Sequence, residues 1–112
     1  KIIERVKTET APYLQERLRE LADHPLVGEV RGVGMLGAIE LAKNKQTRER
    51  FPSETGVGMI CRTHCFENGL IMRAVGDTMI IAPPLVISKS EIDELIEKAR
   101  KCLDLTARAV LV

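Results

Sequence analysis

Hydrophobic residues change their spacing along this chain, and the order of the changes limits the folds that it can adopt. Apolar residues recur every three or four positions in residues 3–22, in residues 54–68 and after residue 88, which predicts helices there. Short runs rich in Val, Ile, Leu and Met lie in pairs between these segments and predict strands. The order α-β-β-α-β-β-α predicts an α+β fold, with an antiparallel or mixed sheet and helices on one face.

Proline interrupts the pattern of the first predicted helix. Pro12 lacks an amide hydrogen and clashes with the carbonyl of Thr8, so the helix should kink there or begin near Thr10 as its cap. We therefore expect residues 1–11 to form a frayed lead-in. Residues 23–25 (DHP) end the helix, because the residue before a proline is disfavoured in the helical conformation.

Glycine divides the β-rich runs into two pairs of predicted strands. The four strands are predicted at residues 27–31, 33–42, 70–75 and 78–82. Gly32 separates the first two, and the turn-prone pair Gly76-Asp77 indicates a hairpin between the last two. The polar residues 43–50 that follow the first pair predict an exposed loop.

Capping residues mark the ends of the two later helices. Ser53 is a candidate cap for the helix at residues 54–68, which should end at Gly69. Residues 88–91 (SKSE) match a capping box, the pattern in which a serine and a glutamate three positions later satisfy amide groups at a helix start. The last helix is therefore predicted from Ser88, and residues 106–112 are predicted as a weakly ordered tail.

Composition excludes several classes of partner. The chain has 112 residues, which predicts one domain, with 45% hydrophobic and 29% charged residues, as in a globular protein. Its net charge of +1 supplies no field for a nucleic acid or an anionic membrane, and 3% aromatic residues offer few surfaces for stacking bases. No apolar stretch approaches the roughly twenty residues that a membrane helix needs.

The cysteines indicate a cellular compartment, and the first residues indicate that the chain is part of a longer protein. Three cysteines form an odd and irregularly spaced set, which disfavours a disulfide framework and favours reduced thiols in the cytoplasm. The chain opens on KIIERVK, without an initiator methionine or an apolar signal segment. We therefore expect it to be a piece of a longer protein.

Residues 32–37 (GVGMLG) match the pattern G-x-G-x-x-G, which in dinucleotide-binding proteins brings a backbone close to a pyrophosphate at the start of a helix. The residues that follow do not fit that context. Residues 38–42 are short, alternate in polarity and lead into a charged loop. The competing interpretation is a glycine-lined strand against which another backbone packs closely.

Cys61, His64 and Cys65 are spaced so that a helix would place them on one face, with Cys102 as a distant fourth candidate ligand for a metal. Zinc ligands usually come in pairs from turns or separate elements, whereas cysteine is among the most frequently buried residues without any ligand role. We therefore predict no metal site and expect these residues to pack in the core. No acidic residue is identifiable that would orient His64 for nucleophilic catalysis.

Arg73 is the one charged residue in the apolar run at residues 70–75, and a lone buried guanidinium would be costly. Three interpretations stay open from the residues alone. Arg73 pairs with an Asp or Glu for structure, binds the carboxylate of a ligand through its two-pronged guanidinium, or extends to water from a strand edge.

Three segments together resemble class III pyridoxal-phosphate-dependent aminotransferases, most closely the ω-amino acid–pyruvate type. They are residues 28–41 (GEVRGVGMLGAIEL), 69–77 (GLIMRAVGD) and 82–85 (APPL). The resemblance extends in order over nearly the whole chain. It implies that residues 1–112 are the C-terminal small domain of a fold-type I enzyme, packed on a large domain within a homodimer, and that the glycine-rich run is a strand.

The same resemblance assigns roles. Arg73 stands where these enzymes bind the substrate carboxylate, while the lysine that binds pyridoxal phosphate and the other cofactor-binding groups belong to the large domain. The lysines of this sequence agree, since they lie among charged neighbours or in a loop and a Schiff-base lysine needs a depressed pKa. We expect no catalytic or cofactor-binding residue in this chain and no activity from it alone. The parent enzyme would transfer an amino group from an amine or amino acid to a keto acid such as pyruvate.

A rival hypothesis assigns no chemistry to the chain. In that case it is a free-standing α+β domain that binds a partner or senses a ligand. The two hypotheses differ in whether a large domain with a cofactor-binding lysine accompanies this chain.

Overall fold

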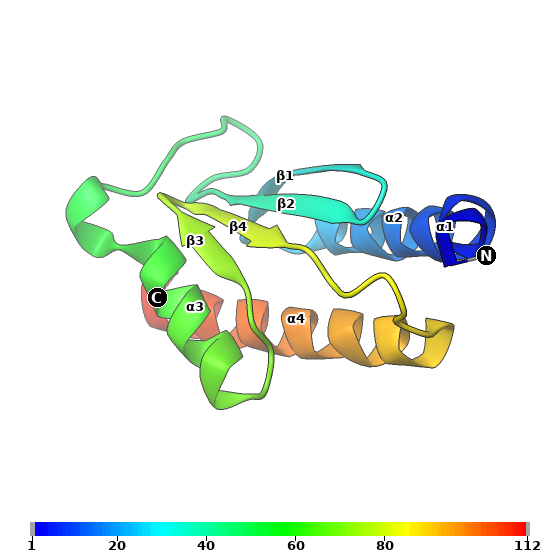
Figure 1. The fold of residues 1–112 in the computed structure, drawn as a ribbon. Helices are drawn as coiled ribbons and strands as arrows, with labels where there is room; N and C mark the ends of the chain where they lie inside the picture. Colours follow the sequence, from blue (N-terminus) through cyan, green and yellow to red (C-terminus); the bar gives the residue numbers. More distant parts are fainter. Residues whose placement is uncertain (1, 112) are drawn as a thin grey trace.

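The computed structural model describes residues 2–111, which form an α+β fold on a four-stranded antiparallel sheet (Figure 1). The helices are α1 (Ile2–Arg5), α2 (Ala11–Glu20), α3 (Val57–Glu67) and α4 (Lys89–Val110). The strands are β1 (Val27–Val33), β2 (Leu36–Leu41), β3 (Arg73–Val75) and β4 (Thr78–Ile81). The predicted order and fold class are confirmed.

The sheet has the order β1-β2-β4-β3, with each neighbouring pair antiparallel. Residues directly opposite each other share one face, so alternate residues form two different surfaces. On the inner face, Ile39 of β2 lies between Val30 and Met79. Ile39 and Met79 are fully buried, because α2, α3 and α4 contribute the other half of the hydrophobic core on this side of the sheet.

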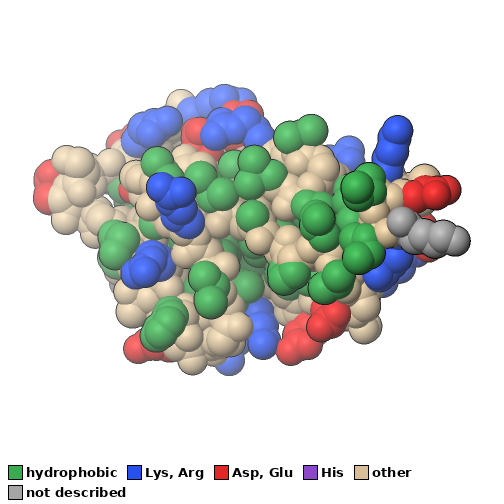
Figure 2. All heavy atoms as spheres, viewed as in Figure 1, with side chains coloured by type: hydrophobic (Ala, Val, Ile, Leu, Met, Phe, Trp, Pro, Cys, Tyr) green, Lys and Arg blue, Asp and Glu red, His purple; other side chains and the backbone are tan. Residues whose placement is uncertain are grey.

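The opposite surface, which we call the open face, has no helix over it among the described residues. Its outward side chains include Val33, Ile71 and Val75, which are 74%, 84% and 50% exposed. Further exposed apolar residues lie on α1 and in the segment before α4, and Figure 2 shows apolar side chains interspersed with Lys and Arg on one side of the molecule. No helix within residues 2–111 is long and apolar enough to cross a membrane.

The first helical segment accommodates Pro12 without a break. Residues 6–10 form a π-helical turn between α1 and α2, in which the amide of Ala11 donates to the carbonyl of Val6. This wider turn precedes the proline, which occupies the first turn of α2, where a missing amide hydrogen matters least. α2 begins at Ala11, as predicted near Thr10, but Thr10 is itself helical and its side chain makes no capping hydrogen bond. The segment predicted to fray is helical from Ile2 in the structure.

Two predicted strand boundaries move, one because its hairpin turn lies elsewhere and one because the strand begins later than predicted. The first turn is at Gly34, which has a positive φ of 59°, so β1 continues through Gly32 to Val33. In the second hairpin the turn at Gly76 is confirmed, but β3 begins only at Arg73. The amide of Leu70 instead donates to the carbonyl of Cys65 at the end of α3.

The later helices differ from the prediction at one end each. α3 begins at Val57, because Gly56 adopts a left-handed conformation with φ of 61° and separates it from a short 3₁₀ turn at Ser53–Thr55. Ser53 therefore does not cap α3. α4 begins with the predicted capping box but continues to Val110, beyond the start of the predicted tail. Thr106 is fully buried, which holds this last part of the helix on the core. Val112 lies outside the described residues.

Candidate functional site

Arg73 lies on the open face, at the start of the edge strand β3. Its neighbours Met72 and Ala74 point toward the core, while Ile71 and Val75 share its outward direction. The side chain of Arg73 is exposed, and no carboxylate of residues 2–111 forms an ion pair with it. Within the described chain, this arrangement excludes the structural ion pair that was one interpretation of Arg73.

The other arginines of the open face have acidic partners. Arg31 Nη1 lies 3.2 Å from Glu40 Oε2 and 3.8 Å from Glu29 Oε2. Arg50 Nη2 lies 3.9 Å from Glu40 Oε1, and Arg48 Nη1 lies 3.2 Å from Glu29 Oε1. These five residues form an alternating chain of charges across β1, β2 and the following loop, which we call the open-face ion network.

The sequence patterns do not predict this network. Glu40 carries the same signal as Arg73, since it is the one charged residue in the predicted strand at residues 33–42. Its side chain is 19% exposed, and its two partners, Arg31 and Arg50, come from β1 and from the loop after β2. The lone charge could have been noticed, but the identity of its partners depends on the strand register.

The glycine-rich run at residues 32–37 forms the β1–β2 hairpin and opens no helix, which agrees with the strand interpretation. The prediction was that another backbone packs closely against these glycines. In the structure their close neighbours are instead side chains of α2. A Cβ on Gly32 would meet the amide of Gln15 at 2.2 Å, and one on Gly37 would meet Leu18 Cδ1 at 2.5 Å. Gln15 Nε2 also donates to the carbonyls of Gly34 and Leu36, at 2.8 Å and 3.1 Å. The glycines therefore provide space for α2 against the hairpin.

The three cysteines lie in the core between α3 and α4, with exposures of 1% or less. Cys65 Sγ is 3.6 Å from Met72 Sδ. The pKa of the Cys65 thiol is raised, mainly by its hydrogen bond with Cys61 and secondly by burial. Burial also raises the pKa of Cys102. Within residues 2–111 no group of three or more metal-binding side chains is assembled, and His64 is only half-buried. These thiols pack as core residues.

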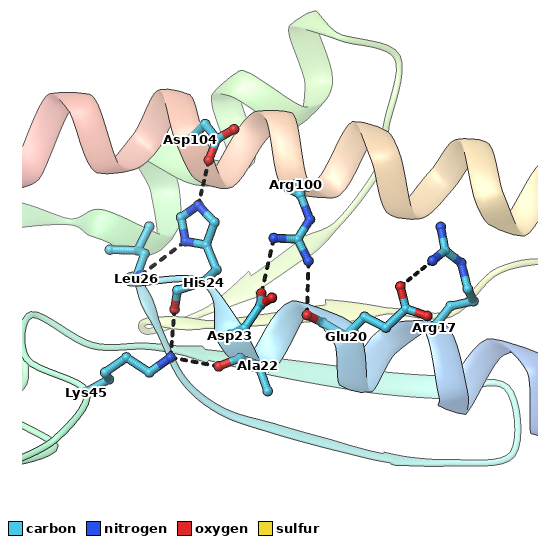
Figure 3. Close-up of polar contacts among 9 residues, drawn as sticks. All are labelled: Arg17, Glu20, Ala22, Asp23, His24, Leu26, Lys45, Arg100 and Asp104. Carbon is cyan, nitrogen blue, oxygen red and sulfur yellow. Dashed lines mark hydrogen bonds and ion pairs between the residues drawn. The ribbon is translucent and has the colours of Figure 1, made fainter.

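A polar cluster at the turn after α2 joins that turn to α4 (Figure 3). His24 is 4% exposed, and its Nε2 lies 2.7 Å from Asp104 Oδ1 while its Nδ1 accepts from the amide of Leu26 at 3.1 Å. Lys45 Nζ donates to the carbonyls of Ala22 and His24, at 2.8 Å and 3.2 Å. The cluster joins three segments that are distant in the sequence.

The described lysines are all at or near the surface. Lys98 pairs with Glu94 at 3.2 Å, and Lys89 lies 5.4 Å above the ring of Tyr13. Lys45 binds backbone carbonyls, as described above. None of them is buried in the apolar surroundings that lower the pKa of a Schiff-base lysine.

The structure thus combines a sheet built from two hairpins, helices on one face of it and a solvent-facing arginine at its edge. Comparison with known proteins identifies its family. The model of the family "Aminotransferase class-III" matches residues 1–103. The chain is 77% identical to putrescine–pyruvate aminotransferase of Pseudomonas aeruginosa over 111 residues, which cover 99% of this chain and 24% of that protein. This chain belongs to the class III aminotransferases.

Further relatives agree in sequence and in structure. A mitochondrial gamma-aminobutyrate transaminase of Solanum lycopersicum is 40% identical over 97% of the chain and 21% of that protein. The crystal structure of an omega-transferase from Vibrio fluvialis superposes with a TM-score of 0.92 at 32% identity, over 97% of this chain and 26% of that one. A PMP-bound aminotransferase of the same organism gives 0.90 at 32% identity, over 99% and 24%. The chain thus spans about a quarter of the length of these relatives.

Proposed function

We propose that residues 1–112 are the C-terminal small domain of a longer pyridoxal-phosphate-dependent aminotransferase, and that Arg73 binds the carboxylate of its substrates. The enzyme would transfer an amino group from an amine or amino acid to a keto acid such as pyruvate. Family membership supports the reaction type, and the name of the relative at 77% identity, putrescine–pyruvate aminotransferase, supports pyruvate as acceptor. The observation that carries the role of Arg73 is its exposed guanidinium without an acidic partner among the described residues.

The proposed partners are the large domain of the same chain and a second copy of the enzyme. Exposed apolar side chains on the open face, such as Ile71 and Val33, support a surface that another part of the protein covers. Three free cysteines support a reducing compartment, and we propose the cytoplasm. The amino donor would react at the cofactor bound outside this chain, while this chain would orient the carboxylate.

A substitution at Arg73 tests the proposed role directly. In the full-length enzyme, Arg73→Ala should lower kcat/KM for carboxylate-bearing substrates and spare amines that lack a carboxylate. A charged hydrogen bond contributes roughly 1.5–3 kcal/mol, so the loss should be roughly tenfold to a few hundredfold. Arg73→Lys should recover only part of it, because a point charge replaces a planar fork.

The matched control is Arg108→Ala, which removes another exposed arginine near the end of α4. Each half-reaction is measured separately with the cofactor bound. Equal losses toward donors with and without a carboxylate would show that Arg73 supports the fold and does not select the substrate.

The expected location of the cofactor is tested on the isolated chain. We expect pyridoxal phosphate to form only nonspecific imines with surface lysines, because the proposed Schiff-base lysine lies in the large domain. Borohydride reduction followed by peptide mapping measures this. A single lysine labelled stoichiometrically within residues 1–112 would contradict the proposal.

A further inference from the structure

We propose that Glu40 determines which keto acids the enzyme accepts, by keeping Arg31 paired so that Arg73 is left as the carboxylate-binding arginine of the open face. The enzyme would then favour keto acids with one carboxylate over those with two. This inference rests on the proposed role of Arg73 and concerns the same surface.

The strand register places Arg31 and Arg73 in one row across the open face. Arg73 lies opposite Ile80, Ile80 opposite Ala38, and Ala38 opposite Arg31. Three strand spacings separate the two arginines, or about 14 Å between their Cα atoms. Between them stand only Ala38 and Ile80, which carry no charge. Two long guanidinium side chains could therefore approach the two ends of one dicarboxylate from opposite edges of the sheet.

The surface beside Arg31 also has room for a ligand. A hollow there is lined by Arg31, Val33, Leu36 and Ala38, with backbone from the adjoining glycines. The apolar lining suits the carbon chain of a small acid, and the guanidinium lies at its border. Arg31 itself is 52% exposed, so its position does not prevent contact with a ligand.

Ion pairing occupies Arg31 instead. Glu29 and Glu40 lie directly opposite each other on adjacent strands, an arrangement of like charges that is unfavourable without cations nearby. Arg31 contacts both carboxylates, at 3.8 Å and 3.2 Å. A substrate carboxylate would be the third anion around this one guanidinium. Arg73 has no such competitor among the described residues.

Glu40 is the residue that controls this pairing. It makes the shorter contact to Arg31 and is more enclosed than Glu29, with side-chain exposures of 19% and 33%. Glu29 has a separate partner in Arg48 at 3.2 Å. If Glu40 loses its charge, Arg31 keeps only the longer contact to Glu29 and gains free N–H donors for a second carboxylate.

The test uses the full-length enzyme and compares a dicarboxylate keto acid, 2-oxoglutarate, with pyruvate. Glu40→Gln should raise the ratio of kcat/KM for 2-oxoglutarate over pyruvate by about tenfold or more, since a charged hydrogen bond is gained. The gain should appear mainly in KM, because binding improves and the reacting groups are unchanged. Adding Arg31→Gln to this variant should return the ratio to its original value. Glu97→Gln on α4 is the matched control for loss of one exposed acid.

Arg31→Gln alone provides a measurement that does not depend on the folding of Glu40→Gln. It should change kcat/KM for pyruvate by less than about twofold, a difference too small for a lost charged hydrogen bond. A tenfold loss would show that Arg31 already binds the substrate and would overturn the inference.

The remaining outcomes separate this inference from the proposed function. An unchanged ratio in folded Glu40→Gln, or a gain that persists after Arg31→Gln is added, overturns the role of Glu40 while Arg73→Ala still impairs carboxylate substrates. If Arg73→Ala has no selective effect, the proposed function itself fails.

Discussion

The two faces of the sheet are built from alternate residues of the same four strands, yet one is buried under helices and the other is exposed. On the inner face, residues such as Ile39 and Met79 are fully buried against three helices. On the open face, arginines and glutamates form a network beside exposed apolar side chains such as Ile71. Burial of apolar surface stabilises the fold, whereas exposed ion pairs contribute little to stability. The difference assigns stability to the inner face, and we propose recognition as the task of the open face.

The largest expected effect is a cavity on the inner face. Leu18 of α2 is fully buried and packs against the space left by Gly37. Leu18→Ala should lower the free energy of unfolding by about 2–5 kcal/mol, through lost burial and an unfilled cavity. Urea denaturation of the chain, followed by circular dichroism, measures the change.

The matched substitution on the open face is Val33→Ala, where the side chain is 74% exposed. It should change the free energy of unfolding by no more than about 0.5 kcal/mol. Comparable losses for Leu18→Ala and Val33→Ala would remove the distinction between the faces.

The next effect concerns the polar cluster that joins the turn after α2 to α4. His24→Ala leaves the amide of Leu26 without its acceptor and Asp104 without its donor, in a site where the imidazole is 4% exposed. A buried polar group without a partner costs about 1–3 kcal/mol, so the free energy of unfolding should fall by that amount. Asp104→Asn, whose amide oxygen can still accept from Nε2, should cost less. If both variants unfold like the unchanged chain, the cluster does not stabilise the fold.

Sequence patterns predicted the elements whose signals are local. The capping box at Ser88 and the turn at Gly76 each depend on residues within four positions, and both are confirmed. The start of α3 was predicted too early, because Ser53 is a residue type that often caps helices. The left-handed conformation of Gly56 instead sets the boundary, and α3 begins at Val57. Local signals compete, and the sequence does not say which one prevails.

Contacts between distant residues could not be predicted in this way. His24 and Asp104 are 80 positions apart, and their contact depends on how α4 crosses the turn after α2. The pairing of Arg31 with Glu40 depends on the β1–β2 register. Arg73 stands out in the sequence as the one charged residue in an apolar run. That it has no acidic partner among the described residues can be seen only in the folded structure.

A smaller effect is expected at the start of α4, which belongs to neither face. The side chain of Ser88 accepts from the amide of Glu91 at 3.2 Å, and Glu91 accepts from the amide of Ser88 at 2.9 Å. Ser88→Ala should lower the free energy of unfolding by about 1 kcal/mol. Urea denaturation at neutral pH measures it, and Ser90→Ala, two residues after Ser88 in the first turn, is the control that keeps both hydrogen bonds of the capping box.

The capping box also has a pH dependence with a definite sign. The hydrogen bond from the backbone of Ser88 lowers the pKa of Glu91 below its ordinary value of 4.5. Because the folded-state pKa is the lower one, the stabilisation is complete above the unfolded pKa and is lost as the pH falls through the folded pKa. The difference between the unchanged chain and Glu91→Gln should therefore be present at neutral pH and shrink at acidic pH. A difference that grows on acidification would contradict the role of the carboxylate.

The smallest expected effect returns to the open face. Arg48 contacts Glu29 at 3.2 Å, but the arginine side chain is 68% exposed, so water and salt screen the pair. Arg48→Gln should change the free energy of unfolding by about 0.2–1 kcal/mol at low salt, and this difference should nearly vanish in 1 M NaCl, where the screening length is about 3 Å. Arg100→Gln is the comparison from the inner side, because Arg100 Nη2 donates to the carbonyl of Glu20 at 2.9 Å, a contact that survives screening better. A salt-independent loss at Arg48 would mean that the open-face ion network stabilises the fold, and the division of tasks between the two faces would then be wrong.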